Sequence, residues 1–307
     1  MVHGTHNALN DPRNENIKIY INGKLHPRND AKISVFDSGY LVGDGVWEAM
    51  RLHHGVLVFL DKHLDRLWQG AAAIGMPLKF TRKELIGNIW KTLRANNMHD
   101  GVHVRIMVTR GIKKTPSQDP RLTISGPNVV IIAEHKKAAP ESKEKGIVLF
   151  TSTYRRGSPD YLDPRLNCHS KLHEVQALIQ AIEAGADEAL MLDIHGFVST
   201  CNATNFFIIK NNEVWTSTGQ YCMNGITREN VILICEQNNI ICRQKNFSLV
   251  DVYSADEAFV TGTFGGLTPV IKIDGRIIGD GKYGAFTKML SALYEGLIRS
   301  EIEKSGN

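Results

Sequence analysis

The sequence predicts an α+β protein of two domains. The chain has 307 residues, of which 42% are hydrophobic, so it is long enough for a substantial core and for two domains of ordinary size. Segments with the alternation of strands are mixed with segments of helical periodicity in both halves. A polar stretch at 134–146, EHKKAAPESKEKG, contains a proline and no apolar periodicity, which predicts an interdomain connection.

The first half is expected to combine strands with two helices. An alternating run at 17–21 leads into the turn pair Asn22-Gly23, which predicts a β-hairpin. Thr81 and Glu84 form a capping-box pattern ahead of apolar residues at helical spacing, so a helix is expected to begin there. The other expected elements are a helix at 62–74 and buried strands at 102–108 and 129–133.

The second half is expected to be richer in strands. Asp274-Gly275 predicts a hairpin between strands at 270–273 and 276–278. The other expected strands are 147–152, 188–193 and 206–210, and the expected helices are about 171–184, 227–238 and 286–302. The predicted organisation is a flexible N-terminal segment at 1–16, a small α/β domain at 17–137, a linker at 138–146 and a larger domain at 147–307.

Charge and composition favour a small-molecule partner. The net charge of +4 is spread without a long basic run, so no surface for nucleic acid or membrane is indicated. Segment 1–16 lacks the apolar core of a signal peptide, and charged residues interrupt every apolar run, so a cytoplasmic protein is expected. The five cysteines are odd in number and include no CxxC pair, which argues against a disulfide framework and against a zinc site.

Lys171 is the candidate nucleophile of the chain. It follows the polar loop of DPRLNCHSK and precedes an apolar segment of helical periodicity. A bound carbonyl cofactor can approach an amine at such a position, where the amine has to lose its proton to form an imine. Most lysines are solvated surface charges, so position alone only suggests this role.

Two further motifs suit an anion such as a phosphate. NGITRENV places Gly225 before a predicted helix, where the backbone amides of Ile226 and Thr227 and the helix dipole favour negative charge. FVTGTFGGLTPV carries Thr263 between strand-like segments, in a turn whose hydroxyl and amide groups can contact phosphate or carboxylate oxygens. Each motif has an ordinary structural explanation, and their order after KHLDRL and Lys171 is what makes them specific.

From about residue 17 onward, the chain resembles the fold-type IV, or class IV, aminotransferases that use pyridoxal 5′-phosphate (PLP). The resemblance implies a small N-terminal and a larger C-terminal α/β domain, and a homodimer with its active site near the subunit interface. It implies that Lys171 is the Schiff-base lysine and that Arg66 of KHLDRL binds the cofactor phosphate. The other residues that it implies are Gly225, Ile226, Thr227 and Thr263 at the phosphate, and Trp47, Arg105, Thr263 and Phe264 at the substrate.

Position 200 departs from the family pattern. Most of these enzymes carry a glutamate five residues before the asparagine of STCNATNFF, where it keeps the pyridine nitrogen protonated, and this chain has Thr200 there. A hydroxyl shares only a neutral hydrogen bond, whereas a carboxylate stabilises the pyridinium by charge. Asn202 is a neighbour that offers a substitute contact.

The resemblance implies ping-pong transfer of an amino group from an amino acid to a 2-keto acid, with a branched-chain L-amino acid or a D-amino acid as donor. Two alternatives remain open. One is a PLP lyase of the 4-amino-4-deoxychorismate lyase type, which eliminates pyruvate and needs no acceptor. The other is a weakly active PLP-binding homologue, which the threonine at position 200 favours.

Overall fold

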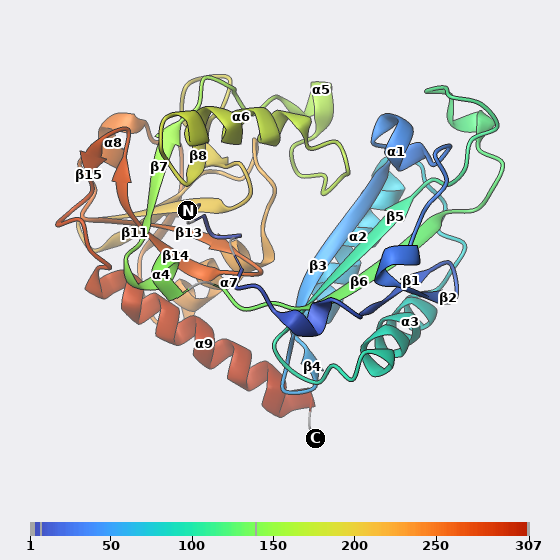
Figure 1. The fold of residues 1–307 in the computed structure, drawn as a ribbon. Helices are drawn as coiled ribbons and strands as arrows, with labels where there is room; N and C mark the ends of the chain where they lie inside the picture. The colour runs from blue at the N-terminus through green and yellow to red at the C-terminus, as the bar shows by residue number, and fades with distance from the viewer. Residues whose placement is uncertain (1–3, 7, 139, 306–307) are drawn as a thin grey trace. The chain divides into compact units, whose positions relative to one another are not determined.

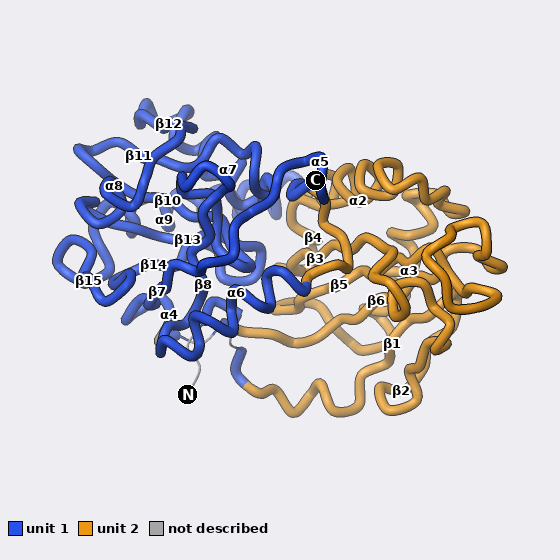
Figure 2. Tube along the Cα trace, turned by 90° about the horizontal axis from the view of Figure 1, so that it is seen from above, with its two compact units in different colours: residues 1–9, 138–165, 172–304 blue, residues 10–137, 166–171, 305–307 orange. Residues whose placement is uncertain are grey.

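A computed structural model describes residues 4–6, 8–138 and 140–305 of the chain. The described residues fall into two compact units (Figure 2). Unit 1 comprises residues 1–9, 138–165 and 172–304, and unit 2 comprises residues 10–137, 166–171 and 305–307. The short segment 166–171 therefore belongs to unit 2, although the chain on both sides of it belongs to unit 1.

Unit 2 is built on a six-stranded antiparallel sheet of order β2-β1-β6-β5-β3-β4. The strands are β1 (Lys18–Ile21), β2 (Lys24–Pro27), β3 (Gly45–His53), β4 (Val56–Leu57), β5 (Val102–Thr109) and β6 (Asn128–His135). Successive side chains of a strand point to opposite faces. One face of β5 is therefore wholly apolar, with Val102, Val104, Ile106 and Val108 all buried.

Helices α2 (Leu60–Ala73) and α3 (Arg82–Ala95) bury their apolar sides in the core of unit 2. Leu64 and Leu67 of α2 and Leu85 and Ile89 of α3 belong to this core, at the three- and four-residue spacing of one helix face. The predicted capping box of α3 is confirmed, because Thr81 and Glu84 exchange their hydrogen bonds. The shorter helices of the unit are η1 (Pro12–Asn14), η2 (Arg28–Asp30), α1 (Ser38–Val42) and η3 (Pro120–Leu122).

Unit 1 contains a nine-stranded mixed sheet of order β12-β11-β10-β13-β14-β7-β8-β9, with β15 paired to β14. β7 runs parallel to β14 and β8, whereas β13 is antiparallel to both of its neighbours, β10 and β14. The strands are β7 (Ile147–Thr151), β8 (Glu188–Leu192), β9 (Val198–Cys201), β10 (Asn205–Lys210), β11 (Glu213–Thr216), β12 (Cys242–Gln244), β13 (Glu257–Gly262), β14 (Gly266–Ile273) and β15 (Arg276–Ile277).

Helices lie on both sides of this sheet. In Figure 1, α6 runs above its strands and α9 below them. The helices are α4 (Pro140–Glu144), α5 (Pro159–Leu162), α6 (Leu172–Glu183), α7 (Ile226–Gln237), α8 (Leu249–Tyr253) and α9 (Ala285–Ser305). Ile208, Val260 and Val270, from three adjacent strands, are among the residues of its main core.

Among the features that differ from what the sequence predicts, three concern β3, the predicted linker and the N-terminal segment. β3, with nine residues, was not predicted, because its core-facing run Val46, Glu48, Met50, Leu52 includes a charged residue. The stretch predicted as a linker contains helix α4. Within the segment predicted to be flexible, Thr5 is buried and its backbone N–H donates to Glu188, at 2.9 Å. The α+β class itself is confirmed.

Candidate active site

The buried carboxylate of Glu48 is the centre of a hydrogen-bond network between β3 and α2. Glu48 of β3 is fully buried and accepts hydrogen bonds from Arg66, through Nε at 2.6 Å and Nη2 at 2.9 Å. His63 Nδ1 lies 2.7 Å from Glu48 Oε2. His63 and Arg66 stand three residues apart on α2, a spacing that puts both side chains on the face that contacts β3. This network holds the Arg66 guanidinium in one orientation.

The electrostatics of the network favour an ionised Glu48. Burial alone raises the pKa of the Glu48 carboxyl, but the charge of Arg66 and the hydrogen bonds from His63 and Arg66 outweigh burial, so the pKa lies below its ordinary value. Burial lowers the pKa of His63 by more than Glu48 raises it. The side chain of Arg66 is 15% exposed. Its guanidinium is a permanent cation whose N–H donors lie in one plane, and the network fixes it in this part of unit 2.

Segment 166–171 lies along β3. The backbone N–H of Trp47 donates to Asn167 O, and that of His169 donates to Gly45 O, both at 3.0 Å. Asn167 Nδ2 donates to Trp47 O at 2.7 Å and approaches Glu48 Oε1 at 3.4 Å. Asn167 therefore joins the Glu48 network. Lys171 ends the segment half-buried, one residue before α6.

The two residues predicted to line a substrate pocket contact each other. The Arg105 guanidinium lies over the ring of Trp47, 4.0 Å from its centroid, and Trp47 Nε1 donates to Cys168 O at 3.0 Å. Both side chains project from the face of the sheet opposite α2, because they alternate with the core residues of β3 and β5. Burial lowers the pKa of Arg105, and the negative charge of Glu134 partly offsets this lowering.

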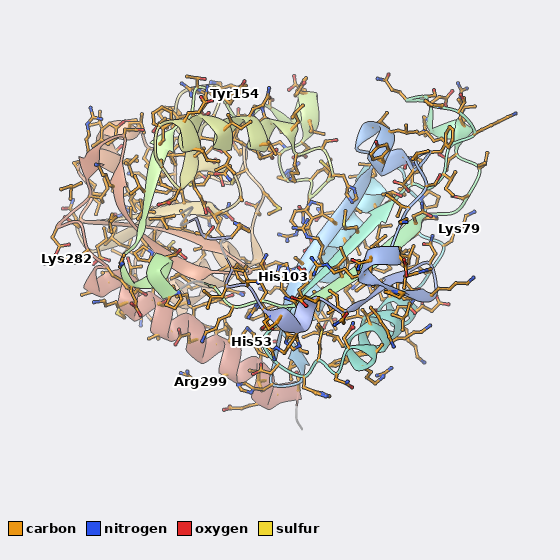
Figure 3. All side chains as sticks on the ribbon, viewed as in Figure 1. His53, Lys79, His103, Tyr154, Lys282 and Arg299 are labelled. Carbon is orange, nitrogen blue, oxygen red and sulfur yellow. The ribbon has the colours of Figure 1, made fainter. Side chains whose placement is uncertain are left out.

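Further ionisable residues, basic and acidic, lie on the same face of the sheet, opposite α2. Arg51 of β3, His103 of β5 and Glu134 of β6 are cross-strand neighbours, and Figure 3 labels His103 on its strand. Arg51 Nη1 donates to Lys136 O at 2.6 Å. Burial is the main cause that lowers the pKa of Lys136. The charge of Glu134 partly offsets burial, and the charges of Arg105 and Arg51 add to it. Glu134 therefore brings a negative charge to these basic residues and acts on both Arg105 and Lys136.

In unit 1, the first turn of α7 has the geometry of an anion site. Gly225 caps the helix, and the first amides of a helix have no partner within it. A Cβ at Gly225 would clash with Asn205 Oδ1, so only glycine allows this close approach. Ile226 and Thr227 follow, and the Thr227 hydroxyl lies 3.5 Å from that of Tyr294.

Thr200, on β9, is engaged within the protein. Its hydroxyl donates to Thr204 O at 2.7 Å and accepts from Asn205 Nδ2 at 3.3 Å. The single hydroxyl proton is thus already used, and the oxygen retains only acceptor capacity. Asn202 is also engaged, because its Oδ1 accepts from the backbone N–H of Ala189 at 2.8 Å. Asn205 links Thr200 to the turn before α7 through a bond to Met223 O.

The other predicted turn joins β13 to β14. Gly262 and Gly266 pair across it, and Gly266 adopts a positive φ of 63°. Thr263 is half-buried at its start, and Phe264 is 9% exposed. Thr263 thus remains partly accessible within the turn. Among the described residues, no cluster of three or more metal-type side chains is found.

The sequence model of the family described as amino-transferase class IV matches residues 45–273. This range covers most of the chain, including each of the candidate site residues described above. The chain belongs to the class IV aminotransferase family. The predicted resemblance is thereby confirmed. No helix in the described part of this family member is long and apolar enough to cross a membrane.

Individual members of the family support the match along the chain. Branched-chain-amino-acid aminotransferase-like protein 2 of Arabidopsis thaliana is 40% identical over 290 residues, which are 94% of this chain and 52% of that protein. The chain thus spans about half the length of this plant relative. A putative branched-chain-amino-acid aminotransferase of Methanocaldococcus jannaschii is 39% identical, with 92% of this chain and 96% of that protein covered.

The fold agrees with that of a solved family member. The branched-chain amino acid aminotransferase of Thermoproteus uzoniensis, solved with norvaline, gives a TM-score of 0.83 at 27% identity, covering 94% of this chain and 97% of that one. This likeness confirms the predicted fold-type IV architecture.

Sequence reasoning missed the residues that hold the predicted ones in place. Glu48 bonds Arg66, and His63 and Asn167 bond Glu48. Asn205 connects Thr200 with the turn before α7. A signal for Glu48 exists, since a carboxylate within an alternating apolar run has to find a buried partner. Asn167 carries no comparable signal, because asparagines in loops are common.

Proposed function

We propose that this chain is a PLP-dependent aminotransferase that moves an amino group from an amino acid to a 2-keto acid. The observation that carries the proposal is the first turn of α7 in a class IV family member, where Gly225 makes room for the Asn205 side chain and the amides of Ile226 and Thr227 have no partner within the helix, as an anion site requires. We further propose Arg66 as a phosphate-binding cation and Thr263 as a hydroxyl donor to the phosphate.

The residues present suit the phosphate of such a cofactor better than its ring nitrogen. A fixed guanidinium and a helix N-terminus are both typical phosphate-binding groups. Thr200 offers the ring nitrogen an acceptor without charge, since its proton goes to Thr204 O. When bound, the cofactor would supply the electron-withdrawing ring that makes the substrate α-proton removable. We propose that Lys171 bonds covalently to the cofactor and moves that proton.

Trp47 and Arg105 are the proposed substrate contacts, with Phe264. The guanidinium of Arg105, held over the indole ring, suits a carboxylate, and the aromatic rings suit an apolar side chain. A branched-chain L-amino acid or a D-amino acid is the proposed donor. We also propose a homodimer, for which the expected mass in solution is twice the 34.2 kDa of the chain, and a cytoplasmic location.

A panel of L- and D-amino acids, each paired with 2-oxoglutarate or pyruvate, tests the function. The expected result is exchange of amino and keto groups for at least one pair, with no net loss of either. Pyruvate release without an added keto acid would indicate the lyase reaction instead. Absence of exchange for every pair, in protein that retains bound PLP, would refute the aminotransferase.

Borohydride reduction followed by peptide mapping tests Lys171. The expected result is one reduced PLP adduct on Lys171, which Lys171→Ala removes. The matched control is Lys137→Ala, an exposed lysine of unit 2, which should leave the adduct in place. An adduct that persists in Lys171→Ala would show that another lysine carries the cofactor.

A weakly active PLP-binding homologue is the second candidate. Thr200 favours it, because the hydroxyl that replaces the family carboxylate is already bonded to Thr204 O. In this case PLP binds, but a donor amine does not shift its absorbance to that of the pyridoxamine form. Such a shift would exclude this candidate.

A further inference from the structure

Two cysteines of unit 1 come together from α7 and β12. Cys235 lies in the second half of α7, and Cys242 is the first residue of β12. The chain turns back directly after the helix, because the backbone N–H of Ile240 donates to Cys235 O at 2.8 Å. β12 then packs against α7. The two cysteines therefore lie on neighbouring elements.

Their side chains lie on the two faces that pack together. Arg228 and Cys235 share one face of α7, because their separation of seven residues is close to two helical turns. Cys242 and Gln244 share one face of β12, because alternate residues of a strand point to the same side. Arg228 Nη2 donates to Gln244 Oε1 at 3.1 Å, which joins these two faces. The Cys235 thiol accordingly donates a hydrogen bond to the sulfur of Cys242.

The two sulfurs differ in access and in protonation. Cys235 is buried, whereas Cys242 is partly exposed on the edge strand of the nine-stranded sheet. The hydrogen bond from Cys235 is the main cause that lowers the pKa of Cys242, and the charge of Arg228 adds to it, while burial partly offsets both. The same hydrogen bond, together with burial, raises the pKa of Cys235. A thiolate is the nucleophilic form of cysteine, so an accessible nucleophile lies beside a protonated thiol.

We propose that Cys242 and Cys235 form a reversible disulfide when the protein meets hydrogen peroxide, with Cys242 as the attacking sulfur and Cys235 as the resolving one. This inference is independent of the proposed function. Two thiols lose two electrons in the reaction, and the peroxide gains them. A dithiol reductant restores both thiols by exchange.

The reaction has two steps. The Cys242 thiolate attacks one oxygen of the peroxide, the O–O bond breaks, and the leaving hydroxide takes up a proton to become water. Cys242 is then a sulfenic acid. Next, the sulfur of Cys235 attacks the sulfur of Cys242, the S–O bond breaks, and the hydroxyl group leaves as water with the proton of the Cys235 thiol. Each disulfide thus consumes one peroxide and produces two waters.

Peptide mapping of the wild-type protein after treatment with hydrogen peroxide tests the inference. Cleavage after Arg228 and Arg243 releases residues 229–243, which contain both cysteines and no other. The expected result is that this peptide loses two hydrogens and resists alkylation until a dithiol reductant is added. An unchanged peptide would overturn the inference. So would a peptide in which Cys242 stops at the sulfenic or sulfinic acid while Cys235 remains a thiol.

The buried cysteines Cys168, Cys201 and Cys222 are internal controls. Each should remain a thiol under the same treatment and react with an alkylating reagent after denaturation. Oxidation of these three to the same extent as Cys242 would show that peroxide acts on the thiols without selectivity, and the inference would fail.

Two single variants test the order of attack. In Cys235→Ala, the sulfenic acid of Cys242 lacks its resolving thiol, so dimedone, a reagent for sulfenic acids, should label Cys242. In Cys242→Ala, the buried Cys235 should stay unlabelled. Alkylation of Cys242 in the native protein at neutral pH should be about threefold slower in Cys235→Ala, because the thiolate loses its hydrogen-bond donor.

The reverse labelling pattern would overturn the assignment of Cys242 as the attacking sulfur. That pattern is dimedone on Cys235 in Cys242→Ala and none on Cys242 in Cys235→Ala. If either variant fails to fold, the wild-type peptide 229–243 still decides whether the disulfide forms.

Discussion

At the scale of single residues, buried polar groups position the candidate site. Glu48 has no exposed surface, yet it bonds Arg66, His63 and Asn167. A buried carboxylate is tolerated only when paired and hydrogen-bonded, so each of these partners stabilises the ionised form. The pKa of Glu48 therefore falls below its ordinary value despite burial.

Replacing Glu48 by glutamine should destabilise the protein and change its response to acid. Breaking a buried ion pair costs about 3 kcal/mol at neutral pH, because the partner charge is left uncompensated. Since the folded pKa is depressed, the carboxylate stabilises the fold fully above its unfolded value, and this stabilisation is lost as the pH falls through the folded value. Denaturant unfolding between about pH 3 and pH 7 measures both effects.

Glu213→Gln is the matched control for this prediction. Glu213 pairs with Arg243 at 2.5 Å but at the surface, where solvent screens the interaction, so the free energy of unfolding should hardly change at neutral pH. Equal destabilisation by the two substitutions would contradict the role assigned to the Glu48 network.

At the scale of elements, the helix N-terminus of α7 depends on one glycine. Gly225 has a φ of −65°, which any residue adopts, so its requirement is space rather than backbone conformation. The atom that a Cβ would meet, Asn205 Oδ1, belongs to a buried side chain held by Met223 O and Thr200. This side chain is not free to move aside.

Gly225→Ala should therefore lower the free energy of unfolding by about 1–3 kcal/mol and weaken the binding of inorganic phosphate. Gly87→Ala is the control, since it lies inside α3 and its Cβ would meet no atom within 4 Å. Alanine there should stabilise the protein by about 1 kcal/mol, because glycine is a poor helix former. Thermal unfolding measures the stability of the two variants, and calorimetric titration measures their affinity for phosphate. Unchanged phosphate affinity in Gly225→Ala would argue against an anion site at α7.

At the scale of the whole molecule, distant parts of the chain complete each unit. Thr5 and Glu188, separated by 183 positions, bond through the backbone N–H and hydroxyl of Thr5. Glu188 also accepts from the Thr204 hydroxyl at 2.8 Å, on the loop that carries Asn202 and Asn205. The N-terminal segment thus supports the β9–β10 region.

Thr5→Val tests this support. The substitution removes the hydroxyl donor but keeps the shape and the backbone N–H, so a buried carboxylate loses one partner at a cost of about 1–3 kcal/mol. Hydrogen exchange should increase in residues 198–205 of unit 1 and not in β5 of unit 2. An equal increase in hydrogen exchange throughout both units would show that the contact does not stabilise the β9–β10 region specifically.

Local sequence was sufficient to predict the α+β class, the hairpins at Asn22-Gly23 and Asp274-Gly275, the capping box at Thr81 and the family. These depend on periodicity, turn chemistry and motif order, which neighbouring residues specify. Only the folded chain shows that Glu48 bonds and orients Arg66 and that Thr200 is bonded to Thr204. It also shows that segment 166–171 belongs to unit 2 and that Asn167 Oδ1 has no hydrogen-bond partner among the described residues. Such pairings join positions far apart in the chain or depend on burial, and sequence spacing specifies neither.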